Sequence, residues 1–411
     1  MRLSTALFHQ NSVNNILDQQ SRLSRLQGQI ASGRRIVQPS DDPAGTAQIL
    51  RLTQTIEVTT QFQRNVDIAN NRLSLEETTL EAVQNSMTRI RELALQANNS
   101  TLTHTDRVAV AQEVRQRLDE LVSLANTRDA NDEYLFSGFQ ANTRPFTRNP
   151  DGSFAYNGDQ GQRFLQISSG RQIADGDTGS DLFMNIETGN GTFQVRDNAN
   201  NTGSGVIDPG QLLDPSLWVP DDYTITFVTN ANGNRGYNVI GANVGQIIPP
   251  LPQNPVNDAP DFSSDAAISF NGIEVSIEGL PDVGDTFIVS PGVKQDVFTT
   301  VNNLATAMEG GGVSGGDAHI FNAISHAIVD LDNAYDNVLE HRTDIGGRLN
   351  SLDDQRDINQ TFLIDLESTL SGTRDLDLVA AISELQQRAG ALEAAQAAFS
   401  RIARLSLFEF L

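Results

Sequence analysis

Residues 52–97 have the sequence LTQTIEVTTQFQRNVDIANNRLSLEETTLEAVQNSMTRIRELALQA, in which mostly apolar residues recur every seven positions. One row consists of Leu52, Thr59, Val66, Leu73, Leu80, Met87 and Ala94, and a second consists of Thr55, Phe62, Ala69, Glu76, Val83, Ile90 and Ala97. Two such rows make a narrow apolar seam along one side of a helix, against which a partner helix packs. At about 1.5 Å per residue this helix would be roughly 70 Å long, so the stretch predicts a rod.

Two further segments carry seams that match this one. After a polar break at 98–105, Asp106 begins a helix whose seam consists of Ala111, Val114, Leu118, Leu121 and Ala125. Later in the chain, Ile324, Leu331, Val338 and Ile345 again stand seven apart. A short connection between matching seams predicts an antiparallel helical hairpin.

The stretch between Pro145 and Gly316 has a different composition. It contains 12 of the 14 Pro and 24 of the 32 Gly, and helical periodicity is almost absent from it. Asn271-Gly272 predicts a β-hairpin between 267–270 and 273–277, because Asn and Gly accept the positive φ of a tight turn. Further strands are expected at 163–168, 192–196, 223–228 and 285–289, with a short helix through Val297, Val301, Leu304 and Met308.

These segments predict an α+β multidomain fold, in which both chain ends build a long antiparallel helical rod or coiled coil that carries an inserted all-β domain. The expected parts are an N-terminal assembly helix and loop at 1–42, rod segments at 43–146 and 312–370, the β domain at 147–311, and a C-terminal assembly helix at 371–411. The Gly-rich tract 310–316 is expected to be a flexible link.

Both ends of the chain carry apolar stripes of their own. The N-terminal positions are Leu3, Leu7, Ile16, Leu23, Leu26 and Ile30, and the C-terminal positions are Leu378, Leu385, Leu392, Phe399, Leu407, Phe408 and Leu411. The N-terminal stripe buries too little to hold a lone helix together, so that helix is expected to form only against a partner. An exposed stripe usually marks an interaction surface, which favours intermolecular packing over an ordinary intramolecular core.

A loop separates the first helix from the rod. Gly33 ends the first helix, and Pro39 and Pro43 frame a segment in which Ser40, Asp41 or Asp42 caps the next one. Pro43 suits the first turn of that helix, because its fixed φ fits there and its missing N–H is not needed. Pro39, Asp41, Asp42 and Pro43 are therefore predicted to form a structured loop.

The charge balance and the cysteine count exclude several classes of function. The 411 residues include 28 Lys and Arg against 52 Asp and Glu, a net charge of -24, which speaks against a nucleic-acid partner. The absence of Cys excludes disulfides, thiolate metal sites and cysteine nucleophiles. No apolar run predicts a membrane helix or a secretory signal, so the protein is expected to stay in the cytoplasm or to leave by a route that uses no such signal.

The candidate chemical sites are weak. Of the five His, only His319 and His326 share a helix face, and their seven-residue separation is too wide for one metal ion. Asp175, Asp177 and Asp181 resemble a calcium loop, but Ile186 stands where the loop requires Glu, so a solvated turn is expected instead. No catalytic residue, metal site or cofactor is predicted.

Several short motifs stand at the two ends of the chain: MRLST at 1–5, SGRRI at 32–36, PSDDPAG at 39–45, RELALQAN at 91–98, YLFSG at 134–138 and LSLFEFL at 405–411. In this order they resemble the flagellin superfamily and, within it, the hook-filament junction proteins. YLFSG resembles the junction proteins more than filament flagellin. The resemblance covers about the first 146 and the last 95 residues.

The resemblance implies a structural protein of the bacterial flagellum, exported unfolded through the flagellar type III apparatus to an extracellular site. It implies a ring of copies between hook-associated protein 1 and flagellin, termini that are disordered in the monomer and fold on assembly, and a cytoplasmic export chaperone. A filament flagellin is the nearest alternative, and it would elongate filaments. A carbohydrate-acting enzyme in the β domain is a more remote one, and it would require two perturbed carboxyl groups facing each other in a cleft.

Overall fold

The computed structural model describes residues 5–310 and 316–408, which form two compact units. One unit joins the chain up to Val66 with Ile167–Gly170 and the chain from Asp354 onward. The other contains Asp67–Gln166 and Arg171–Asp353. Within the described ranges, no helix is both long enough and apolar enough to cross a membrane.

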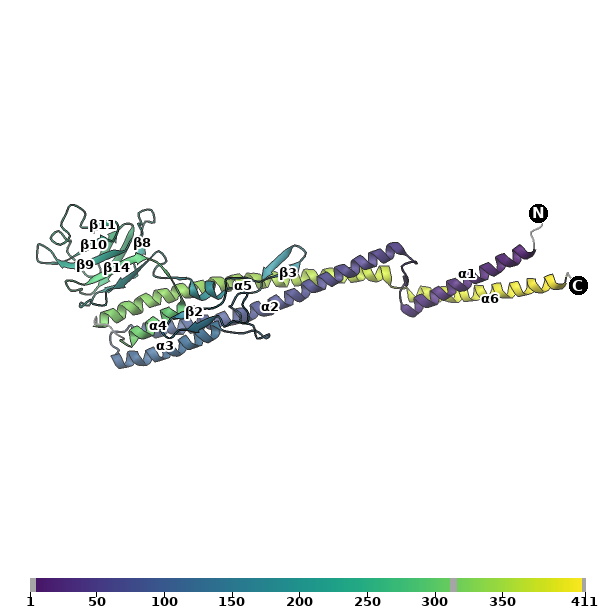
Figure 1. The fold of residues 1–411 in the computed structure, drawn as a ribbon, viewed down its shortest axis with the longest axis horizontal. Helices are drawn as coiled ribbons and strands as arrows, with labels where there is room; N and C mark the ends of the chain where they lie inside the picture. The colour runs from purple at the N-terminus through teal and green to yellow at the C-terminus, as the bar shows by residue number, and fades with distance from the viewer. Residues whose placement is uncertain (1–4, 311–315, 409–411) are drawn as a thin grey trace. The chain divides into compact units, whose positions relative to one another are not determined.

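The helices lie where the seven-residue spacings predict them (Figure 1). They are α1 (Thr5–Ser32), α2 (Pro43–Ala97), α3 (His104–Ala125), α4 (Val297–Met308), α5 (Gly316–Arg374) and α6 (Leu378–Phe408). Thr103 and Asp106 cap α3 reciprocally, and Asp296 accepts the Thr299 N–H at 2.6 Å to cap α4. Most of the predicted link 310–316 lies outside the described residues.

The seam of α2 is buried. From Ala69 onward, the positions of both seven-residue rows are almost fully inaccessible, as are Val114 and Leu118 on α3 and Ile324 and Val338 on α5. Arg91 pairs with Asp332, and Glu77 pairs with Arg342. Since the higher number on α2 meets the lower number on α5, these segments of the two helices run antiparallel. They form a helical core to which α3 contributes its own buried seam.

The region between α3 and α4 begins with short antiparallel hairpins. The first is formed by β1 (Phe146–Arg148) and β2 (Phe154–Tyr156), and the second by β3 (Phe164–Ser168) and β4 (Arg171–Ala174). A single π-helical turn, η1 (Ser180–Met184), follows, and β5 (Ile186–Glu187) then pairs with β15 (Lys294–Gln295). Phe146, Phe183 and Phe298 pack together with ring centroids 5.2 to 5.8 Å apart, so α4 covers this part.

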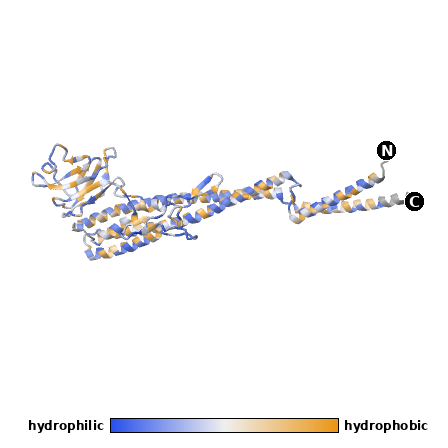
Figure 2. Ribbon diagram, in the orientation of Figure 1, coloured by the Kyte–Doolittle hydropathy of each residue, from blue (hydrophilic) through white to orange (hydrophobic). Residues whose placement is uncertain are grey.

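The remaining strands form two sheets packed around one apolar core. One sheet has the order β11 (Gly245–Ile248), β10 (Arg235–Gly241), β9 (Tyr223–Thr229), β14 (Thr286–Pro291) and β6 (Phe193–Asp197). The other contains β12 (Ala267–Phe270), β13 (Ile273–Glu278), β7 (Val206–Ile207) and β8 (Gln211–Leu212). Inward residues of both sheets, including Phe227, Phe287 and Val275, share the core, and Figure 2 shows hydrophobic residues gathered on these strands.

The predicted Asn-Gly hairpin is confirmed. Phe270 pairs with Ile273, and the two residues between them have positive φ, 45° at Asn271 and 80° at Gly272. Both values suit the tight two-residue turn that these residue types favour. The four other predicted strands are confirmed as β3, β6, β9 and β14.

Candidate functional site

The helices of the two chain ends, α1 and α6, lie side by side (Figure 1). The ring of His9 meets the ring of Phe399 edge-on, with centroids 5.7 Å apart. Leu26 is buried, whereas the other predicted positions of this contact are only partly buried: Ile16, Leu23, Ile30, Leu385, Leu392 and Phe399. The pair therefore has a thin apolar contact with much of each side chain left accessible.

Two predicted positions lie outside this contact. Leu7 is 51% exposed and Leu378 is 48% exposed, and the neighbouring Val379 is 82% exposed. Leu3 and Leu411 lie outside the described residues, as do the side chains of Leu407 and Phe408. The two described residues present apolar surface that α1 and α6 do not cover for each other.

Main-chain hydrogen bonds join the end of α1 to the start of α6. The Arg35 N–H donates to the Arg374 carbonyl at 2.8 Å, and the Leu376 N–H donates to the Gly33 carbonyl at 3.0 Å. The Arg35 guanidinium also donates to the Thr373 carbonyl at 2.7 Å. Gly33 has a φ of 66°, which lets the chain leave α1 at this angle. The two chain segments are therefore held together at this point.

The predicted loop between Pro39 and Pro43 is stabilised by its two aspartates. Asp41 accepts the Gln38 N–H at 3.0 Å, and Asp42 accepts the Gly45 N–H at 2.8 Å, so Asp42 is the residue that caps α2. Pro43 is the first residue of the helix, as predicted. A Cβ on Gly45 would lie 2.5 Å from the Asp42 carboxylate and 2.6 Å from the Ile36 side chain.

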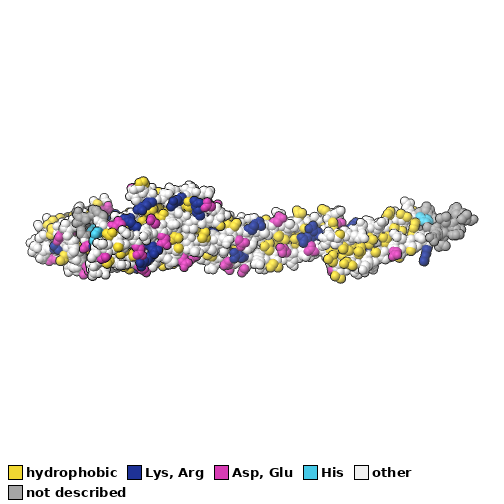
Figure 3. Space-filling model, turned by 90° about the horizontal axis from the view of Figure 1, so that it is seen from below, with side chains coloured by type: hydrophobic (Ala, Val, Ile, Leu, Met, Phe, Trp, Pro, Cys, Tyr) yellow, Lys and Arg dark blue, Asp and Glu magenta, His cyan; other side chains and the backbone are white. Residues whose placement is uncertain are grey.

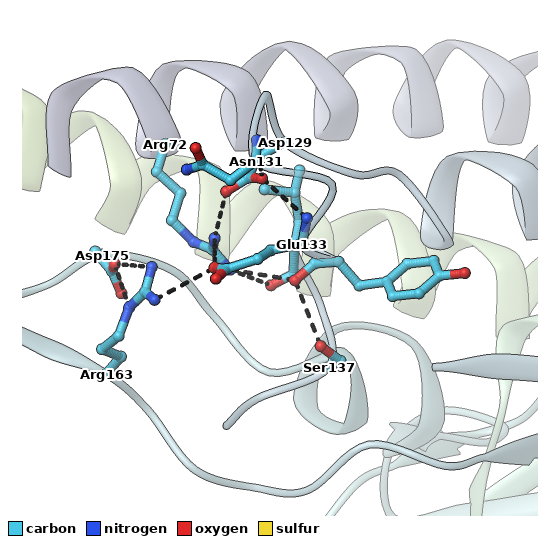
Figure 4. A network of polar contacts seen from close by, with 9 residues as sticks. Arg72, Asp129, Asn131, Glu133, Ser137, Arg163 and Asp175 are labelled. Carbon is cyan, nitrogen blue, oxygen red and sulfur yellow. Dashed lines mark hydrogen bonds and ion pairs between the residues drawn. The ribbon is translucent and has the colours of Figure 1, made fainter. Parts of the chain in front are cut away.

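A cluster of ion pairs, in which Arg72 and Asp175 are buried, connects α2 to the segments around β3 and β4 (Figure 4). The Arg72 guanidinium lies 3.0 Å from Asp129 and 3.7 Å from Glu133. Arg163 lies 2.6 Å from Asp175 and 3.5 Å from the same Glu133. Asp175 is buried, so the prediction of a solvated turn at this position is wrong. The Arg163 guanidinium replaces the water that would otherwise solvate that carboxylate.

The same correction applies to Asp177. The Arg348 guanidinium lies 2.6 Å from its carboxylate, His341 lies 3.7 Å away, and Glu76 accepts its backbone N–H at 3.0 Å. Burial raises the pKa of Asp177, but His341 and Arg348 outweigh that effect and hold the pKa below its usual value. Asp181, the third residue of the predicted turn, accepts a hydrogen bond from the Thr178 hydroxyl at 2.8 Å.

The pKa of Glu76 is shifted in the opposite direction from that of Asp177. Glu76 is 1% exposed, and burial together with the nearby Asp177 carboxylate raises its pKa well above the usual value. Asp177 in turn raises the pKa of His341. These groups are far apart in the sequence. In the seven-residue row Glu76 stands out only as a polar residue within an apolar seam, so the sequence did not indicate its interaction with Asp177.

The polar row of α5, as we define it, consists of His319, Asn322, His326, Asp330, Asn333, Asn337, His341 and Arg348. Most of its bonds reach the main chain of the segments that run beside it: Asn333 donates to the Glu187 and Gly189 carbonyls at 2.9 and 2.7 Å, and Asn337 donates to those of Asp181 and Leu182 at 3.0 and 3.1 Å. Asn322 is buried and bonds both Ile207 and Gly205. Polar residues at spacings of three and four were the signal in the sequence that could have identified this row.

A cavity of about 390 Å³ lies at one end of the polar row, between α5, α4 and β6. Asp197 and Asp330 both line it, and burial raises the pKa of each. Asp197 is paired with His319 at 2.6 Å, and Asp330 accepts the Gly189 N–H at 2.8 Å. Within the described ranges, no group of three or more His, Asp or Glu side chains could hold a metal ion.

Comparison with known proteins adds to this geometry. Residues 3–141 match the model of the bacterial flagellin N-terminal helical region. The chain is 31% identical over 186 residues to flagellar hook-associated protein 3 of Salmonella typhimurium, a match that covers 45% of this chain and 58% of that protein. The chain thus spans little more than half the length of this relative. Over 131 residues it is 37% identical to phase 1 flagellin of Salmonella naestved, covering 31% of this chain and 25% of the flagellin.

A solved structure shows a more extensive likeness. The crystal structure of flagellar hook-associated protein 3 from Legionella pneumophila is 34% identical to this chain and superposes with a TM-score of 0.75. The superposition covers 79% of this chain and 98% of the Legionella chain. Because the strand-rich region makes up more of the chain than the part left uncovered, the similarity includes part of that region as well as helices.

Proposed function

The chain belongs to the flagellar hook-associated protein 3 family, and we propose that it is a non-enzymatic structural adaptor that joins the hook-associated protein 1 ring to the flagellin filament. In this role a ring of copies presents one face to the hook and the other to the first flagellin subunits. Family membership supports the adaptor role over that of a plain flagellin, because the flagellin match covers a much smaller part of both chains.

The observation that carries the mechanism is the thin contact between α1 and α6. Leu7, Leu378 and Val379 are exposed beside it, and Figure 3 shows hydrophobic side chains gathered on the surface of this pair. Isolated amphipathic helices with so little buried area are marginal in water. We propose that the two terminal segments are disordered in the free monomer and form this pair on assembly, when the neighbouring copies cover its exposed apolar residues.

The long helices supply the second set of contacts in this proposal. Apolar side chains stand exposed on α2, at Leu50 and Val58, and on the C-terminal part of α5, at Ile358, Phe362 and Ile364. Contiguous exposed apolar residues are typical of surfaces that bind other proteins. We propose that residues 43–146 and 312–370 make lateral contacts in the ring, while the strand-rich region stays at its outer side.

We further propose that the chain is secreted through the flagellar type III export apparatus and occupies the extracellular flagellum. Terminal helices that fold only on assembly would keep subunits apart before export, and a cytoplasmic chaperone that covers the stripe of α6 would add to that protection. Net charge of -24 at pH 7 would also disfavour premature association.

Two measurements test the proposal. Circular dichroism of the full chain and of a chain cut to residues 40–370 should give nearly the same amount of helix if the ends are disordered. A loss of helix in proportion to the residues removed would refute the disorder-to-order step. Adding the purified protein to filament seeds should cap them, and long new filaments seen by electron microscopy would instead identify a filament flagellin.

A further inference from the structure

His326 differs from the asparagines of the polar row of α5, because one of its ring nitrogens has no hydrogen-bond partner among the described residues. Asn322, Asn333 and Asn337 each donate to main-chain carbonyls of the neighbouring segments. His326 contacts the main chain at Ile207, but its Nε2 is buried and has no hydrogen-bond partner in the described part of the chain. A buried imidazole nitrogen without a partner is costly, so a group that bonds it would be stabilised there.

This nitrogen belongs to a residue that lines the 390 Å³ cavity between α5, α4 and β6. The volume is at the lower end of the range of about 300–1,000 Å³ that is usual for small-molecule sites. The cavity wall combines Arg196, His326 and Asp330 with apolar side chains such as Leu304 and Val329. It therefore has the mixture of an apolar lining and a few polar groups that ligand pockets show.

The charged groups of the wall have opposite signs and lie near one another. Burial raises the pKa of Asp330, and the charge of Arg196 partly opposes this effect. Burial and the charge of Arg196 both lower the pKa of His326, to about 4. The Arg196 side chain is exposed and donates to Gln194 at 2.9 Å, which leaves other guanidinium N–H groups able to bind an anion. His326 is thus neutral at pH 7, and its unpartnered Nε2 can accept a hydrogen bond once it is exposed to the cavity.

We propose that this cavity binds a small zwitterion of the size of a free amino acid. The carboxylate of the ligand binds the Arg196 guanidinium, and its ammonium group donates to Asp330 and, after a rotation of the imidazole that opens Nε2 to the cavity, to His326. The apolar side chains of the wall cover the rest of the molecule. A neutral sugar would leave the guanidinium and the carboxyl groups without an opposite charge, and a simple amine or a simple acid would satisfy only one of them.

The residues that line this cavity are distinct from the contact between α1 and α6, and the test measures binding by the free protein, so its outcome does not depend on the adaptor role. The full-length protein is titrated by isothermal calorimetry with L-leucine and L-alanine, then with isoamylamine, isocaproate and glucose as probes that lack one charge or both. We expect saturable binding of at least one amino acid, and binding weaker by about tenfold or more for each of the three other probes.

Variants then locate the site. Arg196→Gln and Asp330→Asn should each weaken amino-acid binding by about tenfold or more, because each leaves one charged group of the ligand unpaired. Arg171→Gln, at an exposed arginine of β4 outside the cavity, is the matched control and should bind like the wild type. Absence of saturable binding, equal binding of the uncharged probe, or unchanged affinity in both cavity variants would each overturn the proposal.

Discussion

The guanidinium of Arg348 on α5 lies 2.6 Å from the carboxylate of Asp177, which follows β4. The side chains of these residues are only 18% and 6% exposed, so the pair is mostly withdrawn from water. Through it, the helical core holds the segment that leads into the strand-rich region.

Replacing Arg348 should destabilise the protein strongly. Among the described residues, Arg348→Met leaves the buried Asp177 with only His341 as a cationic partner, and we expect a loss of about 3 kcal/mol in the free energy of unfolding. Chemical denaturation followed by circular dichroism measures it. Arg91→Met is the control: it breaks an equally short pair with Asp332, but both side chains are 45% exposed, so the loss should be under about 1 kcal/mol. Equal losses in the two variants would contradict the assigned role of burial.

His341 should make stability depend on pH above neutrality. Asp177 raises the pKa of His341 from its ordinary value of 6.5, so the folded protein binds this proton more tightly than the unfolded chain. The stabilisation is complete below pH 6.5 and is lost as the pH rises through the folded pKa. Unfolding measured between pH 6 and 9 should therefore show a difference between wild type and His341→Gln that shrinks with pH. His104→Gln, at the exposed start of α3, should follow the wild type throughout.

Substitutions in the contact between α1 and α6 should distinguish effects on folding from effects on assembly. Leu26→Ala removes the buried side chain of this contact, so it should reduce both the helix that the ends gain on assembly and the capping of filament seeds. Val379→Ser alters a side chain that is 82% exposed, so it should impair capping while the helix content of the monomer stays unchanged. Full capping activity in Val379→Ser would show that this face meets no neighbouring copy. Ser24→Ala, at an exposed polar position of α1, should change neither property.

Two glycine substitutions should have opposite effects. Gly45→Ala forces a methyl group to within 2.5 Å of the Asp42 carboxylate that caps α2, and we expect a cost of about 1–3 kcal/mol. Gly28→Ala places the same methyl group in open space within α1, where we expect a gain of about 0.5–1 kcal/mol in the stability of this helix once it has formed on assembly. Thermal unfolding checks the first sign in the monomer and the second in the assembled protein. Tolerance of alanine at position 45 would mean that the capped loop can shift.

The amide groups of the polar row of α5 should control local opening. Asn337→Ala removes two hydrogen bonds to the carbonyls of Asp181 and Leu182, which should loosen η1 while leaving the global fold intact. Hydrogen exchange read by mass spectrometry should be faster in peptides that cover residues 180–189. Asp336→Ala changes the exposed neighbouring position and should leave exchange there unaltered. Unchanged exchange in Asn337→Ala would indicate that other contacts hold the π-helical turn.

The sequence predicts the elements well where local periodicity decides them. The seven-residue rows identify α2 and α5, because burial of one face imposes a repeating apolar pattern on the helix. Asn271-Gly272 identifies its hairpin, because few residues other than Gly and Asn adopt positive φ. β10 and β11 were not predicted. β10 carries Gly236 and Gly241 near its two ends, and its strand conformation depends on pairing with β9.

The buried ion pairs could not be predicted from the sequence. Arg72 and Asp129 are 57 positions apart, and Arg348 and Asp177 are 171 apart, so no local spacing relates the partners. Aspartates in a Gly-rich segment are usually exposed, and the solvated turn expected at Asp175 and Asp177 was predicted from that general tendency. The stripes at the chain ends could be found in the sequence. A helix that buries one face has regularly spaced apolar residues, and this pattern is present even when the partner helix lies at the other end of the chain.

The side chains of Asn322, Asn333 and Asn337 bind carbonyl oxygens, which every amino acid carries. These hydrogen bonds therefore depend on the path of the main chain in the neighbouring segments and not on which side chains those segments carry. Substitutions across residues 181–189 that preserve this route cost none of these bonds. The strand-rich region can accordingly diverge under selection, or accept foreign peptide sequences by engineering, without losing its attachment to α5.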